Sequence, residues 1–143
     1  MDEPRKNSHT LDWHQERVSY EQNNDGKNGL VVWIPLQNVD KEKGTLDVCV
    51  GSHKAGFIEP THSGSYGNIQ DTKKFLSDEI ANDYKQQSVK MNMGDALFVS
   101  MLVIHKSGNM DNANKFRLTA TMRIHNTYSN DFNPGRIRFV EST

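Results

Sequence analysis

Short strand-like runs separated by polar turns constrain the fold of this chain more than any other feature. Residues 29–36 (GLVVWIPL) are rich in β-branched and aromatic side chains, and Pro35 limits this run to a strand end or a sheet edge. Residues 45–50 alternate in polarity, residues 96–105 are strongly apolar, and residues 116–128 alternate again. Short strands joined by Gly, Asn and Asp turns predict a mainly β sandwich, jelly roll or barrel.

The middle of the chain is a long polar excursion, residues 58–88. Within it, residues 71–85 predict a short helix, because Leu76, Ile80 and Tyr84 recur at a spacing of four. We therefore expect a β fold with a short helix in a long inserted loop.

Composition excludes several classes of function. The chain has 143 residues, which predicts a single domain over 1–143, and its formal net charge of −1 gives no electrostatic case for nucleic acid or an anionic membrane. No apolar run approaches the ~18 residues that span a bilayer. The single cysteine, Cys49, excludes an intrachain disulfide and favours a reduced, cytoplasmic setting.

The last alternating segment has a polar face made of Arg117, Thr119, Thr121 and Arg123. Inside a small barrel, such a face would line a binding site. Periodicity alone favours the simpler interpretation, a solvated outer face with Arg123 as an ordinary surface residue.

The stretch LDWHQER (11–17) holds a candidate metal-binding pair. His14 and Glu16 project to the same face if the segment is extended, and His105 ends the most apolar strand. Two histidines and one carboxylate can occupy one face of an octahedral metal, as in non-haem Fe(II) oxygenases. Taken alone, the pattern is weak, because such a pair also arises among ordinary polar strand residues.

Arg117 strengthens the metal hypothesis. It lies 12 residues beyond His105, so an antiparallel return of the chain would bring it near the metal. A guanidinium there can hold a carboxylate through two hydrogen bonds. The distal carboxylate of 2-oxoglutarate is the obvious candidate; the alternative is a surface arginine.

The sequence resembles the phytanoyl-CoA dioxygenase family of Fe(II)/2-oxoglutarate oxygenases. The matching pieces occur in the family's order over about residues 11–126: WHQE (13–16), GLVVWIPLQNVDKEKGTLDVCVGSHK (29–54) and GDALFVSMLVIHKSGNMDNANKFRLT (94–119). Together they are similar to the family's Trp-His-x-Asp, Gly-Ser-His-Lys, His-x-Ser and Arg motifs, and the series is far more specific than any one piece.

The resemblance implies a double-stranded β-helix, a jelly roll of the cupin type. It implies that Fe(II) is held by His14, Glu16 and His105, and that Arg117 binds 2-oxoglutarate. The other implied residues of the co-substrate pocket are Ser107, Trp33, Gln15 and Thr119. The implied reaction consumes O2, decarboxylates 2-oxoglutarate to succinate and CO2, and hydroxylates a small-molecule substrate.

The chain departs from the family pattern in two respects. The carboxylate is Glu16 where the family usually has Asp, which moves the oxygen but keeps the ligand type; because it is present, we do not expect halogenation. Only twelve residues precede Trp13, far fewer than in most members. An uncovered sheet edge invites association, so we predict a possible homo-oligomer.

Two other functions remain open at this level. One is a catalytically inactive jelly-roll relative that binds metal or ligand without turnover. The other is a cupin-like metal enzyme that does not use 2-oxoglutarate, which Arg117 would distinguish. The sequence does not identify the substrate. Three residues of the inserted loop could contact it or could equally be solvated: Tyr66, Asn68 and Lys73.

Overall fold

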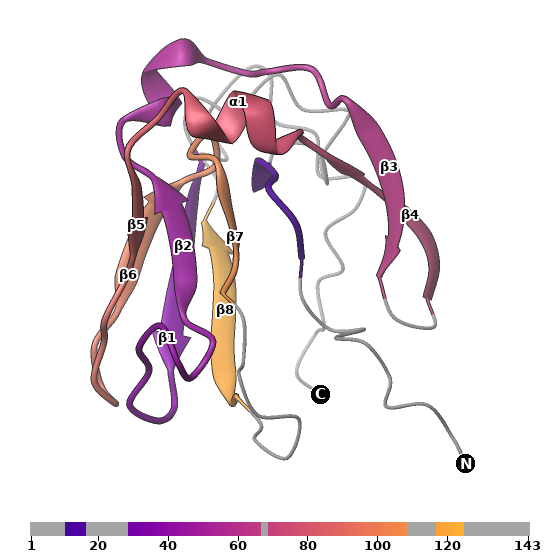
Figure 1. The fold of residues 1–143 in the computed structure, drawn as a ribbon. Coiled ribbons are helices and arrows are strands. Elements are labelled where there is room, and N and C mark those ends of the chain that lie inside the picture. The colour runs from indigo at the N-terminus through magenta and orange to yellow at the C-terminus, as the bar shows by residue number, and fades with distance from the viewer. Residues whose placement is uncertain (1–10, 17–28, 67–68, 109–116, 125–143) are drawn as a thin grey trace.

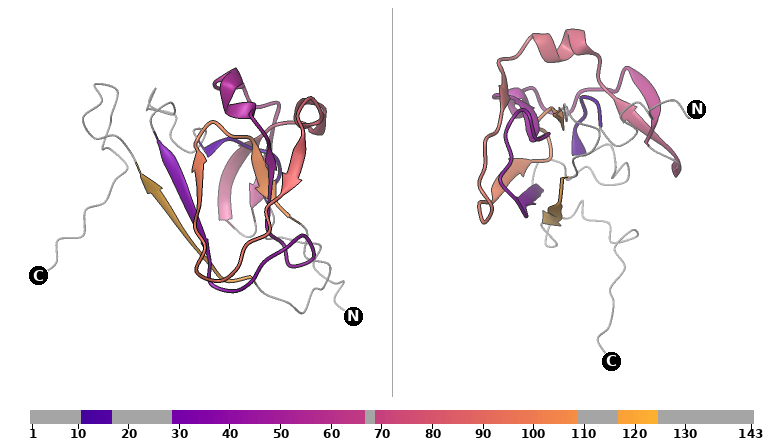
Figure 2. Two further views of the ribbon diagram at one scale, coloured as in Figure 1. Left: turned by 90° about the vertical axis from the view of Figure 1, so that its left-hand side faces the viewer. Right: turned by 60° about the horizontal axis from the view of Figure 1, so that its bottom comes forward.

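Two small antiparallel sheets face each other and form the body of the molecule (Figures 1 and 2). The computed structural model describes residues 11–16, 29–66, 69–108 and 117–124, and for residues 65–73 the backbone alone. One sheet has the order β6-β1-β8 and consists of Leu97–Ser100, Leu30–Pro35 and Thr119–Ile124. The other has the order β5-β2-β7 and consists of Gln86–Ser88, Leu46–Cys49 and His105–Ser107.

The chain crosses between the two sheets repeatedly. It passes from β1 to β2 in the opposite sheet, and β5, β6, β7 and β8 then fall in alternate sheets. Such alternation is the arrangement expected of a double-stranded β-helix, and the prediction of a mainly β fold is confirmed. Pro35 ends β1, as the sequence predicted, and β1 is the central strand of its sheet.

Apolar side chains from both sheets fill the space between them. Trp33 from β1 and Leu46 from β2 pack with Val39 and Met91, and all four are buried. A second cluster, built around Trp13, Cys49 and Ile104, continues toward the short helix α1 (Asp78–Asn82). Residues 45–50 therefore contribute to the core from both faces, because Leu46 belongs to one cluster and Cys49 to the other.

The long connection between β2 and β5 contains less helix than the sequence predicted over 71–85. A short 3-10 turn, η3 (Ser52–Ala55), comes first. Strands β3 (His62–Tyr66) and β4 (Ile69–Phe75) then pair as a separate two-stranded ribbon at one side of the molecule (Figure 1). Of the predicted helix, only the five residues of α1 are helical, because residues up to Phe75 find strand partners in β3.

The apolar run 96–105 is not the single strand that its composition predicted. It divides into β6 and β7, which belong to opposite sheets. Between them the chain turns, with the backbone N–H of Val103 donating to the carbonyl of Ser100 at 3.0 Å. Met101, Leu102 and Ile104 are buried within this turn. A buried turn carries the same apolar side chains as a buried strand, so composition could not distinguish them.

Strand β8 has the opposite orientation to the one that periodicity favoured. Met122 and Ile124 on β8, and Leu118 just before it, are each at least 50% exposed on the outer face. Two residues of the polar face nevertheless contact the inner side of the fold: Arg117 lies over Trp33 and Arg123 binds Glu16, although Arg123 stays partly exposed. The remainder of the predicted strand, residue 116 and residues 125–128, lies outside the described residues.

In the described part of the chain, no helix has the length and apolarity needed to cross a membrane.

Candidate metal centre

The segment 11–16 is fixed by backbone hydrogen bonds on both of its sides. His14 and His105 exchange two of them, at 2.9 and 3.0 Å between nitrogen and oxygen, and Ser107 donates to the carbonyl of Leu11. On the other side, the N–H of Leu76 donates to the carbonyl of Trp13 at 2.8 Å. The segment therefore extends the β5-β2-β7 sheet beyond β7 (Figure 1, indigo).

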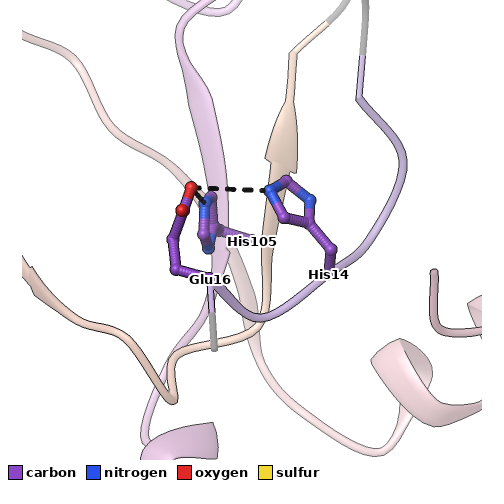
Figure 3. A group of neighbouring side chains, drawn as sticks. All are labelled: His14, Glu16 and His105. Carbon is purple, nitrogen blue, oxygen red and sulfur yellow. Dashed lines mark ion pairs between the residues drawn. The ribbon is translucent and has the colours of Figure 1, made fainter. Parts of the chain in front are cut away.

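The extended backbone separates the side chains of this segment into two sets. Trp13 packs into the core cluster that contains Cys49 and Ile104. His14 and Glu16 point the other way, toward His105 (Figure 3). The same-face arrangement that the His-x-Glu spacing predicts is what the structure shows.

Three buried donor groups converge at this point. The Oε1 atom of Glu16 lies 3.9 Å from Nε2 of His14 and 3.8 Å from Nε2 of His105. The two imidazole rings are 4.4 Å apart between centroids, and one ligand atom from each residue falls within 4.8 Å of the others. Among the described residues, this is the one group of three or more such side chains that could hold a metal ion.

Backbone carbonyls set the tautomer of both histidines. Nδ1 of His14 lies 2.6 Å from the carbonyl oxygen of Asp12, and Nδ1 of His105 lies 3.0 Å from that of Val103. A carbonyl can only accept, so each Nδ1 carries the hydrogen. Each Nε2 then presents a lone pair toward Glu16, which is the form that binds metals.

The electrostatics of the site favour the ligating protonation states. Burial and the neighbouring His105 lower the pKa of His14, so its imidazole is neutral near neutral pH. Burial alone would raise the pKa of Glu16. Its neighbours His105, His14 and Arg123 outweigh burial and hold that pKa well below its ordinary value, Arg123 through a hydrogen bond and its positive charge.

The donor set fits a divalent transition metal. Such ions hold nitrogen and oxygen ligands at roughly 2.0–2.2 Å, so two ligands of one ion lie at most about 4.4 Å apart. The carboxylate-to-histidine separations of 3.8 and 3.9 Å satisfy that limit. Two imidazoles and one carboxylate suit Fe(II) and leave coordination positions open.

Arg117 and Trp33 form a cation–π pair. The guanidinium carbon of Arg117 lies 5.6 Å from the centre of the Trp33 ring, and Nη1 donates to the carbonyl of Gly44. Arg117 does not reach this place through an antiparallel return beside β7, as the sequence suggested. It precedes β8, which pairs with β1 in the facing sheet.

Ser107 and Thr119 lie on β7 and β8, one in each of the two facing sheets. Ser107 is buried on β7, two residues beyond His105 and on the same strand face. Thr119 is half-buried at the start of β8, opposite Pro35. Of the loop candidates, Asn68 and the side chains of Tyr66 and Lys73 lie outside the described part of the structure.

Gln15 is placed differently from the expected co-substrate contact. Its side-chain nitrogen donates to the carbonyls of Gly56 (2.9 Å) and Leu102 (2.7 Å), and its oxygen accepts from the N–H of Ile58 at 3.0 Å. Its side chain is buried on the side of the segment away from His14. Gln15 therefore ties the metal-bearing segment to two loops, and we do not retain it as a pocket residue.

Arg123 is the functional candidate that sequence reasoning missed. Its Nε donates to Oε2 of Glu16 at 2.8 Å. The signal was present in the alternating polar face of residues 117–123, but periodicity does not show which face of a strand is inward. Glu16 and Arg123 are 107 positions apart, so no local pattern could connect them.

A profile of the phytanoyl-CoA dioxygenase (PhyH) family matches residues 1–118, which is most of the chain. The chain belongs to the phytanoyl-CoA dioxygenase family. Among curated proteins, none matches it.

Several solved structures share the fold of this PhyH-family chain. The epimerase SnoN in complex with Fe3+, alpha ketoglutarate and nogalamycin RO has a TM-score of 0.60 at 15% identity, over 87% of this chain and 45% of its own. AviO1 from Streptomyces viridochromogenes Tue57 has a TM-score of 0.58 at 18% identity, over 85% and 45%. EctD from S. alaskensis with 2-oxoglutarate and 5-hydroxyectoine has a TM-score of 0.57 at 15% identity, over 80% and 38%.

These likenesses confirm the predicted cupin-like jelly roll. The chain spans less than half the length of the three structures.

The bonds of Gln15 generate a stability prediction. Gln15→Leu leaves the buried carbonyl of Leu102 and the partly buried carbonyl of Gly56 and N–H of Ile58 without their partner, so the free energy of unfolding should fall by more than about 2 kcal/mol. Urea denaturation measures this. Gln87→Leu makes the same change at an exposed residue of β5 and should alter stability by less than about 0.5 kcal/mol. Equal effects of the two substitutions would contradict the supporting role of Gln15.

Proposed function

We propose that this chain carries the catalytic centre of an Fe(II)- and 2-oxoglutarate-dependent dioxygenase that hydroxylates a small molecule. The observation that carries the proposal is the convergence of His14, Glu16 and His105, three buried donors brought together from opposite ends of the sequence. Membership of the PhyH family supports it, as do neighbours described as bound to Fe3+ with alpha ketoglutarate, or to 2-oxoglutarate.

In this proposal, His14 and His105 offer their Nε2 lone pairs and Glu16 offers one negative charge. Fe(II) held there would supply oxidising chemistry with 2-oxoglutarate and O2: one oxygen atom would go into succinate as 2-oxoglutarate loses CO2, and the other into the hydroxyl group formed at a substrate C–H bond. The protein orients the ligands and keeps the metal centre apart from bulk water. The burial of all three residues contributes to both effects.

Arg117 is proposed to bind the distal carboxylate of 2-oxoglutarate. Its guanidinium already lies over Trp33 on the inner side of the fold, where a planar cation is held in place by the ring and by Gly44. Ser107 and Thr119 offer hydroxyl groups on β7 and β8. We propose these four residues as the co-substrate pocket.

Hydroxylation is the reaction we propose at the substrate carbon. SnoN is described as an epimerase, so a shared fold does not by itself fix the outcome. Succinate formation that depends on O2 and on a substrate would distinguish a dioxygenase from a jelly roll that only binds its ligands.

We also propose that the chain forms a homo-oligomer. Phe98 on β6 is 63% exposed, and Met122 on β8 is 51% exposed on the same sheet. Pairing of these outer faces would remove apolar surface from water. Native mass spectrometry should show a mass of at least twice 16.3 kDa, whereas a clean monomer at micromolar concentration would remove this idea.

The role of Arg117 generates a binding prediction. In protein loaded with Mn(II), which binds without turnover, Arg117→Ala should weaken 2-oxoglutarate binding by about 30-fold or more, because a charge-assisted contact is lost. Calorimetry measures the affinity, and Lys90→Ala, which removes an exposed cation, should leave it unchanged. Unchanged affinity in Arg117→Ala, with Mn(II) still bound, would favour a metal enzyme that does not use 2-oxoglutarate.

A further inference from the structure

We infer that Arg123 is a positioning residue of the metal centre, which holds Glu16 so that one carboxylate oxygen faces the metal. The inference rests on the metal-binding part of the proposed function. It does not depend on the co-substrate, on the substrate or on the reaction.

The two oxygens of Glu16 have different partners. Oε2 accepts from Nε of Arg123 at 2.8 Å, the length of a strong charge-assisted hydrogen bond. Oε1 is the atom nearest to both histidines, at 3.9 and 3.8 Å. Figure 3 shows this carboxylate directed toward His14 and His105. One oxygen is thus anchored to β8, and the other is presented to the cluster.

Anchoring matters more for Glu than for Asp. Glu16 has one more rotatable bond than an aspartate at the same position, so an unanchored carboxylate can swing away or turn both oxygens onto one ion. Carboxylates bind metals in both one-oxygen and two-oxygen modes. Holding Oε2 on Arg123 favours the one-oxygen mode, which leaves the other positions of the metal open for further ligands.

The location of Arg123 allows this role. It lies on β8 opposite Val31 of β1, on the face that is turned toward the space between the sheets. Its side chain is 34% exposed, whereas that of Glu16 is 8% exposed. Arg123 thus joins a strand of one sheet to a ligand that is attached to the other sheet.

A positioning role and a purely electrostatic role of Arg123 predict opposite changes in metal affinity when Arg123 is replaced. A positive charge this close to a metal repels it, so a purely electrostatic Arg123 would lower metal affinity, and Arg123→Met would raise it. A positioning Arg123 organises the ligand, so Arg123→Met should lower metal affinity by about 10- to 100-fold, the usual effect of losing a group that orients a metal ligand.

The experiment is a double-substitution cycle on Mn(II) affinity, measured by electron paramagnetic resonance without co-substrate. Arg123→Met should weaken Mn(II) binding by about 10- to 100-fold when residue 16 is Glu. In the Glu16→Asp background the shorter side chain cannot reach both Arg123 and the histidines, so Arg123→Met should change affinity by less than about threefold. Lys90→Met removes an exposed cation and should have no effect.

Each outcome separates this inference from the proposed function. The positioning role would be overturned if Arg123→Met left Mn(II) affinity unchanged or made it tighter. It would also be overturned if Arg123→Met lowered the affinity equally with Glu and with Asp at residue 16. Either result would leave the metal centre itself intact. A wild-type protein that binds no metal would contradict both the positioning role of Arg123 and the proposed metal centre. If circular dichroism shows that Arg123→Met does not fold, Arg123→Lys replaces it in the same cycle. Arg123→Lys should lower Mn(II) affinity less than Arg123→Met would, and again only when residue 16 is Glu.

Discussion

The pair of backbone hydrogen bonds between His14 and His105 is the interaction on which the rest of the site depends. These bonds join an extended segment near the start of the chain to β7, and they set the two histidines directly opposite each other. The alternation of side chains then places Glu16 on the same side as His14 and sends Trp13 into the core. A slip of one residue in this pairing would exchange the two sets and abolish the cluster.

The second constraint is the cost of burying a carboxylate. An ionised group taken out of water loses several kcal/mol of solvation unless charges and hydrogen bonds replace it. Glu16 regains such interactions from Arg123, which offers a hydrogen bond and an opposite charge, and a metal cation held between Glu16 and the two imidazoles would add to them. The resulting cluster connects three parts of the fold: the segment 11–16, β7 in one sheet and β8 in the other. Affinity for a metal and cohesion between the sheets therefore share the same residues.

The sequence was most informative where spacing and order along the chain decide the structure. The strand over residues 29–36 and the shared face of His14 and Glu16 follow from local periodicity. The joining of His105 to that pair came from the order of motifs, because no local pattern connects residues 91 positions apart.

The sequence was least informative where a choice depends on the other elements. An apolar run does not reveal whether it is a strand or a buried turn, so 96–105 was predicted as one strand. An alternating strand does not reveal which face is inward, so Arg123 was assigned to the surface. The amide of Gln15 could equally serve a ligand or the backbone, and only the surrounding carbonyls of Gly56 and Leu102 decide between them.

The central claim is that His14, Glu16 and His105 hold Fe(II) in a form that binds 2-oxoglutarate. The most direct test is an anaerobic titration of the protein with Fe(II) and 2-oxoglutarate, followed in the visible spectrum. The wild type should develop a weak metal-to-ligand charge-transfer band, which His105→Ala abolishes and which His53→Ala, at an exposed histidine of η3, leaves unchanged. A folded wild-type protein that develops no band with both components in excess would contradict the claim.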